Sequence, residues 1–387
     1  MTKEKDPFAD VDKEQARRPE ASSFADRVRR VDADWTRKPP PPRQWLVSYQ
    51  DDVEGDGDDR KRRVRGFIAR GEMHLLVGEG GVGKGHVVCQ LATTLAAATP
   101  RLLDGHVISD TFPSRLGFNA HPLRDDEKIL VIVGEDDEHE MHARIYAAAK
   151  AEELDDEHAA RVVDRLRWRS YKGETTTLVD LSDDQKAIPT DEMGELLRYI
   201  DEEGPFALVV VDPYSRFIAI EDNANTLQHQ AATVLEAIAT ARGRPAVLLV
   251  GHVSKPEKDQ RENRQLSQHD ARGASAVVNA VRVCHAMAPG SGKVVVDGDG
   301  KETPPGPTAR EIVEHFVRLA CVKNNLGAKG LEKRLSWTPD GGLYVEDEKA
   351  RRERRKRQWR GGLPRPASKK TPVRVGADDD VTAGDDA

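Results

Sequence analysis

Short, nearly continuous apolar runs alternate with amphipathic helical patterns along the middle of the chain. The clearest runs are FALVVVDP at residues 206–213 and PAVLLVGHV at 245–253, and ANTLQHQAATVLEAIATARG between them predicts a helix that ends at Gly243. MHLLVG at 73–78 and KILVIVGED at 128–136 predict two further strands, each followed by a helical pattern. Strands that are apolar throughout and alternate with helices indicate an α/β fold whose mainly parallel sheet is covered by helices on both faces.

The C-terminal third has a different pattern. AVVNAVRVCHAMAP, REIVEHFVRLACVKNN and KRLSWTPDGGLYVED predict further strands joined by hairpin turns. Residues 290–307 are rich in Gly and Pro and hold few apolar anchors, so a projecting loop is expected there.

Both ends of the chain are predicted to lie outside the folded core. The chain is 37% hydrophobic and 33% charged, which is low and high respectively for a globular protein. Residues 1–60 and 349–387 hold many of the charged and few of the hydrophobic residues, so we expect disorder in both segments. Residues 349–387 consist of a basic run followed by an acidic tail. Residues 61–348 form the predicted folded domain, on which QWLVSY at 44–49 could dock as a strand or a clasp.

Charge and cysteine usage exclude several classes of protein. A net charge of -7 argues against coating nucleic acid by bulk charge, although the basic run at 349–360 could bind phosphates or serve as a solvated tail. The three cysteines, Cys89, Cys284 and Cys321, lie far apart without metal-ligand spacing, which favours reduced core thiols. No apolar run is long enough to span a bilayer, so a soluble, cytoplasmic protein is expected.

A phosphate-binding loop is the strongest chemical motif. GEGGVGKG fits G-x-x-x-x-G-K, with a strand before it and a helix after it. Glycines let successive backbone N–H groups face the phosphates, and the helix N-terminus adds positive potential. The predicted nucleotide-binding residues are Gly78, Glu79, Gly80, Gly81, Val82, Gly83, Lys84, Gly85 and His86.

Gly85 departs from this motif. The position normally carries Ser or Thr, whose hydroxyl binds Mg²⁺, and glycine offers no side-chain oxygen. A water could take the hydroxyl's place, because Mg²⁺ retains water readily. The departure therefore puts fast hydrolysis in question more than nucleotide binding.

Several further segments follow in a characteristic order. They are VIVGEDD, LVVVDP, LLVGHVSKP, ARGASAVVNAVR and VKNNLGAKG. With the phosphate loop and its lead-in RGFIARGEMHLLVG, they make residues 64–345 resemble the RepA-type hexameric replicative helicases of plasmids and phages, within the RecA-like, KaiC-like P-loop ATPases. The resemblance implies a RecA-like P-loop fold with ATP and Mg²⁺ as cofactors.

The resemblance also implies roles for four polar residues at predicted strand ends. Glu135 would polarise the attacking water with support from Asp136, although both residues also suit a helix N-terminus. Asp212 would hold Mg²⁺, although an Asp before Pro is common in turns. His252 would sense the γ-phosphate, against the alternative of an ordinary structural histidine.

The remaining candidates belong to contacts between subunits. By the resemblance, Arg282 would enter a neighbouring subunit's site as an arginine finger, with Arg272 as the second candidate and a surface ion pair as the alternative. Lys323 and Asn324 could contact nucleotide or a neighbour. A finger acting in trans implies a homo-oligomer, and the family implies a hexameric ring.

The predicted function is an ATP-driven helicase or translocase that acts on single-stranded DNA in plasmid, phage or prophage replication. The alternative is a regulatory or DNA-binding ATPase that uses nucleotide to switch its assembly without unwinding DNA, and Gly85 favours it. A small-molecule kinase would share the phosphate loop, but no acceptor-binding pattern is recognisable.

Overall fold

The computed structural model describes most of the chain between residues 43 and 360. The described residues are 43–50, 66–99, 101–103, 106–109, 111–220, 224–253, 266, 275–327, 329 and 332–360. The helices and strands of the described residues all belong to the unit 44–387. Arg272 and the predicted tail residues 1–42 and 361–387 lie outside the described residues.

Nine strands of the described chain form one mixed sheet. In spatial order they are β17 (Leu343–Val345), β16 (Lys333–Trp337), β15 (Arg310–Asn324), β14 (Val283–Val296), β3 (Met73–Gly78), β13 (Ala246–His252), β12 (Phe206–Asp212), β8 (Lys128–Val133) and β9 (Leu166–Ser170). Neighbours from β14 to β9 pair in parallel, and β14 to β17 pair antiparallel. The mainly parallel α/β sheet predicted from the apolar runs is confirmed.

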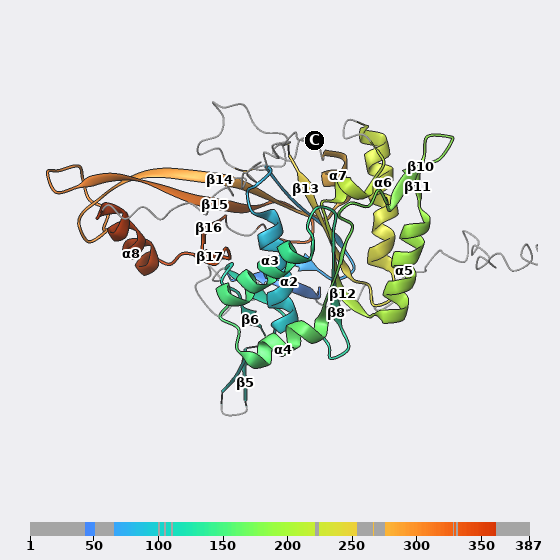
Figure 1. The fold of residues 1–387 in the computed structure, drawn as a ribbon, viewed down its shortest axis with the longest axis horizontal. Coiled ribbons are helices and arrows are strands. Elements are labelled where there is room, and N and C mark those ends of the chain that lie inside the picture. The colour runs from blue at the N-terminus through green and yellow to red at the C-terminus, as the bar shows by residue number, and fades with distance from the viewer. Residues whose placement is uncertain are drawn as a thin grey trace, which may run out of the picture. The chain divides into compact units, whose positions relative to one another are not determined.

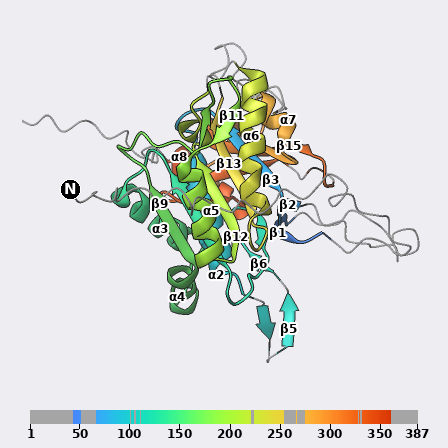
Figure 2. The ribbon, with the colours of Figure 1, turned by 90° about the vertical axis from the view of Figure 1, so that its right-hand side faces the viewer.

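Helices cover both faces of this sheet, as Figures 1 and 2 show. The helices are α2 (Lys84–Ala97), α3 (Glu138–Ala151), α4 (Asp156–Arg165), α5 (Asp191–Glu203), α6 (Asn225–Thr240), α7 (Ser275–Ala280) and α8 (Glu348–Trp359), and a 3₁₀ turn, η3, spans Tyr214–Phe217. Alternate residues of β12 enter two separate cores: Leu208 and Val210 pack with α2, whereas Val209 and Val211 pack with α5 and α6. All four side chains are fully buried, which explains the unbroken apolar run.

Smaller sheets flank the large one. A sheet in the order β2-β1-β7-β6 contains β1 (Trp45–Tyr49), β2 (Gly66–Ala69), β6 (Phe112–Pro113) and β7 (Phe118–Ala120). Two hairpins pair β4 (Arg101–Leu103) with β5 (His106–Ser109), and β10 (Val179–Leu181) with β11 (Ala187–Pro189). The predicted strand QWLVSY is confirmed as β1, and its Leu46 and Val47 lie in the core beside α2. All three cysteines are buried, as predicted.

Two predictions for the C-terminal third are wrong. Residues 275–280 form α7 rather than a strand, and Val277 and Val278 pack against α6 in the core. Residues 290–296 belong to β14, because Gly290 pairs with Phe316 and Val296 with Arg310, so the loop is shorter than expected. The Gly- and Pro-rich composition concealed a strand that pairs with only one neighbour in this part, and such a strand needs few apolar anchors.

Residues 348–359 also differ from the expected disordered tail. They form α8, which packs along the outer half of the β14–β15 hairpin. Figure 1 shows α8 beside the part of the hairpin that runs beyond the neighbouring strands. Asp347 begins the helix as an N-cap, because its side chain accepts a hydrogen bond from the Ala350 amide.

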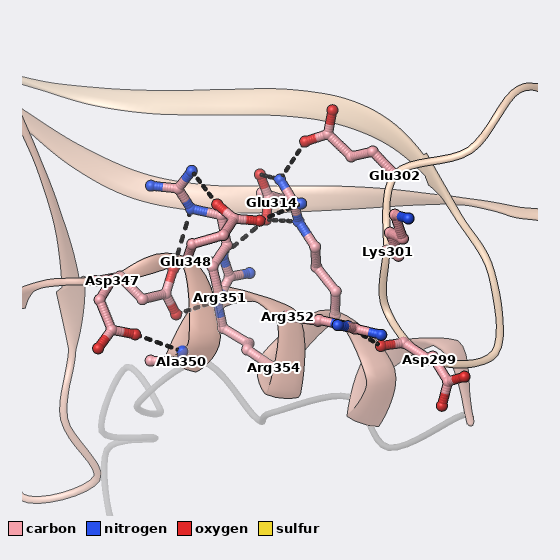
Figure 3. A network of polar contacts seen from close by, with 12 residues as sticks. Asp299, Lys301, Glu302, Glu314, Asp347, Glu348, Ala350, Arg351, Arg352 and Arg354 are labelled. Atoms are coloured by element: carbon pink, nitrogen blue, oxygen red, sulfur yellow. Dashed lines mark hydrogen bonds and ion pairs between the residues drawn. The ribbon is translucent and has the colours of Figure 1, made fainter.

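Ion pairs, rather than apolar packing, hold α8 in place (Figure 3). Glu314 of β15 accepts from Nε of Arg355 at 2.9 Å and from Nη2 of Arg354 at 2.8 Å. Arg355 also donates to Glu302 at 2.6 Å, and Arg354 to Glu346 at 2.7 Å. The Arg355 and Glu314 side chains are 2% and 1% exposed, so hydrophobic periodicity could not reveal this contact. Because carboxylates neutralise much of the basic run, it is less available for binding phosphates.

Replacing Arg355 by alanine should release α8. A buried carboxylate that loses a partner costs about 3 kcal/mol, which corresponds to roughly 100-fold faster amide exchange in α8. Hydrogen–deuterium exchange of peptides from 348–359 measures this effect, and Arg357→Ala serves as the control because Arg357 is exposed in the same helix. Equal exchange in the two variants would show that the ion pairs do not hold the helix.

Candidate functional site

Polar residues gather where the parallel strands β3, β8, β12 and β13 end. Gly78 pairs in register with His252, and Asp212 with Val133, so these strand ends lie side by side. The amide of Gly134 donates to the Asp212 carbonyl at 2.8 Å, which holds the start of the VIVGEDD turn against β12. β13 lies between β3 and β12 and thus separates the phosphate-loop strand from the strand of Asp212. Carboxyl ends of parallel strands are where α/β sheets bind ligands.

The phosphate loop connects β3 to α2 through left-handed glycines. Gly81 and Gly83 have φ of 78° and 100°, and α2 begins at Lys84. A Cβ at Gly83 would lie 2.8 Å from Cη2 of Trp337 in β16. Gly83 is therefore required both for its backbone conformation and for the close approach of Trp337. The loop exposes the N-terminus of a 14-residue helix, where backbone N–H groups can bind an anion.

Lys84 folds back over this loop. Its ammonium donates to the carbonyls of Gly78 at 2.7 Å and Glu79 at 3.0 Å, and lies 3.2 Å from Nδ1 of His252. Burial lowers the pKa of Lys84, and the nearby carboxylates of Asp212 and Glu79 oppose that shift. The contact brings together two residues that are 168 positions apart and were predicted separately for the same site.

His86 lies next to the loop in a neutral form. Burial, together with the Arg144 guanidinium, lowers the pKa of His86 to about 4. Its ring meets the ring of Trp337 edge-on, with centroids 5.0 Å apart. His86 therefore adds no positive charge to the site near neutral pH, and Lys84 supplies the positive charge of the loop itself.

Two of the acidic residues, Asp136 and Asp212, lie beside one guanidinium, that of Arg144 in α3. Arg144 forms a two-pronged ion pair with Asp136, in which Nη2 donates to Oδ1 at 2.7 Å and Nη1 contacts Oδ2. Burial raises the pKa of Asp212 to about 6, and Arg144 is the main charge that opposes the rise. Burial also raises the pKa of Asp136, again against Arg144. Glu135 is exposed just after β8, and its carboxylate opposes the lowering of the Lys84 pKa by burial.

Arg144 was not among the residues predicted for the site. It follows Asp136 by eight positions on an ordinary amphipathic helix, and no motif marks it. The sequence does hold one indication of a nearby cation. Gly85 leaves space where a side chain is normal, and the acidic pair at Glu135 and Asp136 needs a positive charge beside it.

The residues present do not fit the usual Mg²⁺ site of this loop. A Cβ at Gly85 would overlap Nη1 of Arg144 and lie 3.5 Å from Oδ2 of Asp212, so a guanidinium fills the position of the missing hydroxyl. Among the described residues, no group of three or more His, Cys, Asp or Glu side chains is arranged to hold a metal ion. The role of Asp212 as a metal ligand stays a prediction.

Other candidates lie at the opposite edge of the sheet. Arg282 precedes β14, which is parallel to β3, so the six residues of β3, roughly 20 Å, separate it from the phosphate loop. Its side chain is 56% exposed, and its Nε lies 3.7 Å from Glu72. The ammonium of Lys323 donates to the carbonyls of Val278 and Val281 at the end of α7, and Asn324 accepts from the Leu326 amide. None of the described residues that were predicted to bind nucleotide in the same chain lies at this edge of the sheet.

The raised pKa of Asp212 predicts an unusual pH dependence. Between the ordinary value of 3.8 and about 6, the folded protein binds this proton more tightly than the unfolded chain, so stability falls as pH rises through that range. At about pH 7.5, Asp212→Asn should therefore be more stable than wild type by about 3 kcal/mol, and the difference should vanish below about pH 4.

Urea unfolding over this pH range tests the expectation. Asp184→Asn is the matched control, because Asp184 is exposed between β10 and β11. An Asp212→Asn variant that is less stable than wild type at about pH 7.5 would mean that attraction to Arg144 and Lys84 outweighs the cost of burial.

The chain resembles known proteins both in structure and in its match to a family profile. The ATPase domain of G40P is a similar solved structure, with a TM-score of 0.43 and 11% identity over 73% of this chain and 87% of that chain. No curated protein matches the chain. Within the described residues, no helix is long and apolar enough to cross a membrane.

The profile of the AAA domain family matches residues 19–258, which is more than half of the 387 residues. The matched region includes the phosphate loop, the acidic turn after β8, Asp212 and His252. The chain is a member of the AAA domain family, and its phosphate loop follows a strand of a mainly parallel sheet.

Proposed function

We propose that this protein hydrolyses ATP and couples hydrolysis to movement on single-stranded DNA, as a ring-shaped RepA-type helicase or translocase. The observation that carries the ATPase part is the convergence of Lys84, His252, Asp212 and Glu135 at one edge of the sheet. The resemblance to the RepA-type helicases supports the DNA part.

Three of the converging residues, Lys84, Glu135 and His252, have a chemical task in hydrolysis. The backbone amides at the start of α2 and the Lys84 ammonium bind the β- and γ-phosphates. The exposed carboxylate of Glu135 orients the attacking water and accepts its proton. His252 lies 3.2 Å from the Lys84 ammonium and so is positioned to respond when the γ-phosphate leaves. Mg²⁺, where bound, would neutralise phosphate charge.

Arg282 supports an oligomer. It is exposed and lies across the sheet from the phosphate loop of its own chain, so a contribution to hydrolysis would be made in a neighbouring subunit. Head-to-tail contacts of this kind close into a ring when the rotation between subunits closes, and otherwise extend into a filament. A hexamer is the proposed assembly, and Arg282 the proposed arginine finger.

A regulatory ATPase is the second candidate function. The guanidinium beside Gly85 favours it, because a site without the usual hydroxyl is expected to turn over slowly. In that case nucleotide binding would switch the assembly, and DNA would not accelerate hydrolysis.

ATP hydrolysis should rise when single-stranded DNA is added. Lys84→Ala should abolish ATP binding, whereas Glu135→Gln should retain binding and lower the hydrolysis rate by at least about 100-fold, because it removes only the proton acceptor. Equilibrium binding and phosphate release separate the two effects. Lys186→Ala, on the exposed β10–β11 turn, is the control. Binding without stimulation by DNA would favour the regulatory ATPase.

Mixing two inactive variants tests Arg282. Arg282→Ala alone should lower DNA-stimulated hydrolysis by about 1,000-fold, because an arginine finger stabilises charge on the transferring phosphoryl group. A mixture of Lys84→Ala and Arg282→Ala subunits should regain activity, since some interfaces combine an intact Lys84 with an intact Arg282. No recovery, or a monomer by native mass spectrometry with ATP and DNA present, would contradict action in trans.

A further inference from the structure

The space beside Gly85 is shared by two groups of opposite charge. A Cβ built on Gly85 would overlap Nη1 of Arg144, lie 3.0 Å from its Cζ, and lie 3.5 Å from Oδ2 of Asp212. The guanidinium therefore packs directly on the Gly85 backbone, between the start of α2 and the strand end of β12. Any side chain at position 85 would displace it.

Arg144 is held at this place from the other side. Its two-pronged ion pair with Asp136 fixes the plane of the guanidinium, and the side chains are 22% and 15% exposed. The helix that carries Arg144 is itself fixed at its start, because Asp137 forms a capping box with Glu140. Arg144 is thus a positioned cation rather than a mobile surface arginine.

Arg144 and a divalent cation at Asp212 compete for one place. A second cation beside Asp212 would meet the fixed positive charge of Arg144, and repulsion between close charges is strong in a partly buried site. The hydroxyl that would help to hold the ion is absent at Gly85, and the carboxylate of Asp136 is already paired. Space, charge and donors therefore all favour the guanidinium over the metal.

A guanidinium can also do what the metal does for phosphates. It has five N–H donors, and the two contacts with Asp136 leave others for phosphate oxygens. Lys84 follows Gly83 at the start of α2 and Arg144 covers Gly85, so two fixed cations and the helix N-terminus surround the loop.

We propose that Arg144 replaces the divalent cation at the phosphates, so that this chain binds nucleoside triphosphate without Mg²⁺. Gly85 has a matching role: it is the residue that admits Arg144. The inference rests on the proposed function of residues 78–86 as a nucleotide site, and it defines how that site neutralises the phosphates.

Calorimetric titration with ATP, in Mg²⁺ and in EDTA, tests this proposal. Wild type should bind with a Kd that changes less than about threefold between the two conditions. Arg144→Ala should weaken binding in EDTA by about 10- to 100-fold, the usual effect of losing a charged hydrogen bond. Lys150→Ala, an exposed cation on the same helix, is the matched control and should not change the Kd.

Two substitutions of Gly85 separate the steric effect from metal binding. Gly85→Ala should displace Arg144 without adding a donor, and so weaken binding in EDTA as Arg144→Ala does. Gly85→Ser should displace it and add the hydroxyl, so that Mg²⁺ strengthens binding by at least about 10-fold. The double variant Gly85→Ser with Arg144→Ala should show the same dependence on Mg²⁺. Urea unfolding checks that each variant is folded.

The outcomes distinguish this inference from the proposed function. Absence of ATP binding to folded wild type, with or without Mg²⁺, would overturn both. Wild-type binding that requires Mg²⁺ and is unchanged or tightened by Arg144→Ala would overturn the inference alone. Arg144 would then be a group that the metal displaces, and the nucleotide site would stand.

Discussion

Parallel strands that are buried on both faces must all present their carboxyl ends at one edge of the sheet, and the site depends on this constraint. β3, β13, β12 and β8 are paired in register, and their ends bring the phosphate loop, His252, Asp212 and Glu135 together. The same constraint places Arg282 at the opposite edge, because it precedes rather than follows a parallel strand. One arrangement of strands thus separates the groups proposed to bind phosphate from the group proposed to act on a neighbour.

Charge balance is the second organising feature of the molecule. At the strand ends, burial raises the pKa of Asp136 and of Asp212, and the positive charge of Arg144 opposes that rise. At the β14–β15 hairpin, the carboxylate of Glu314 compensates the buried positive charge of Arg355. In both places an arginine on a helix reaches a carboxylate on or beside the sheet. Part of the basic run of α8, which resembled a nucleic-acid-binding segment, is paired with carboxylates of the same chain.

Most of the fold was predictable, because apolar runs with Gly and Pro boundaries report directly on buried strands. Leu208, Val209, Val210 and Val211 are apolar because both faces of β12 are covered, and this pattern needs no tertiary information. α8 was not predictable in the same way, because ion pairs rather than an apolar stripe bind it. Residues 290–296 were wrongly predicted as a loop. They form a strand with few buried side chains, so apolar residues do not mark it, and the Gly and Pro content of residues 290–307 is typical of a loop.

The residues of the candidate site were predictable where motifs mark them and not where packing decides. Lys84, Glu135, Asp212 and His252 lie in characteristic segments, whereas Arg144 is recognised only once α3 is placed against α2. Gly85 illustrates the difference. In the sequence it is a missing hydroxyl, and in the structure it is the space that an arginine occupies.

The central claim is that the loop from Gly78 to His86 binds a nucleotide whose phosphates face Lys84 and Arg144. A crystal structure with ATPγS and Mn²⁺, using anomalous scattering to locate the metal, tests this directly. The account predicts phosphates at the N-terminus of α2, with Arg144 in hydrogen-bond contact and no Mn²⁺ between Asp212 and the γ-phosphate. Mn²⁺ at that position with Arg144 turned away, or nucleotide bound elsewhere, would contradict it.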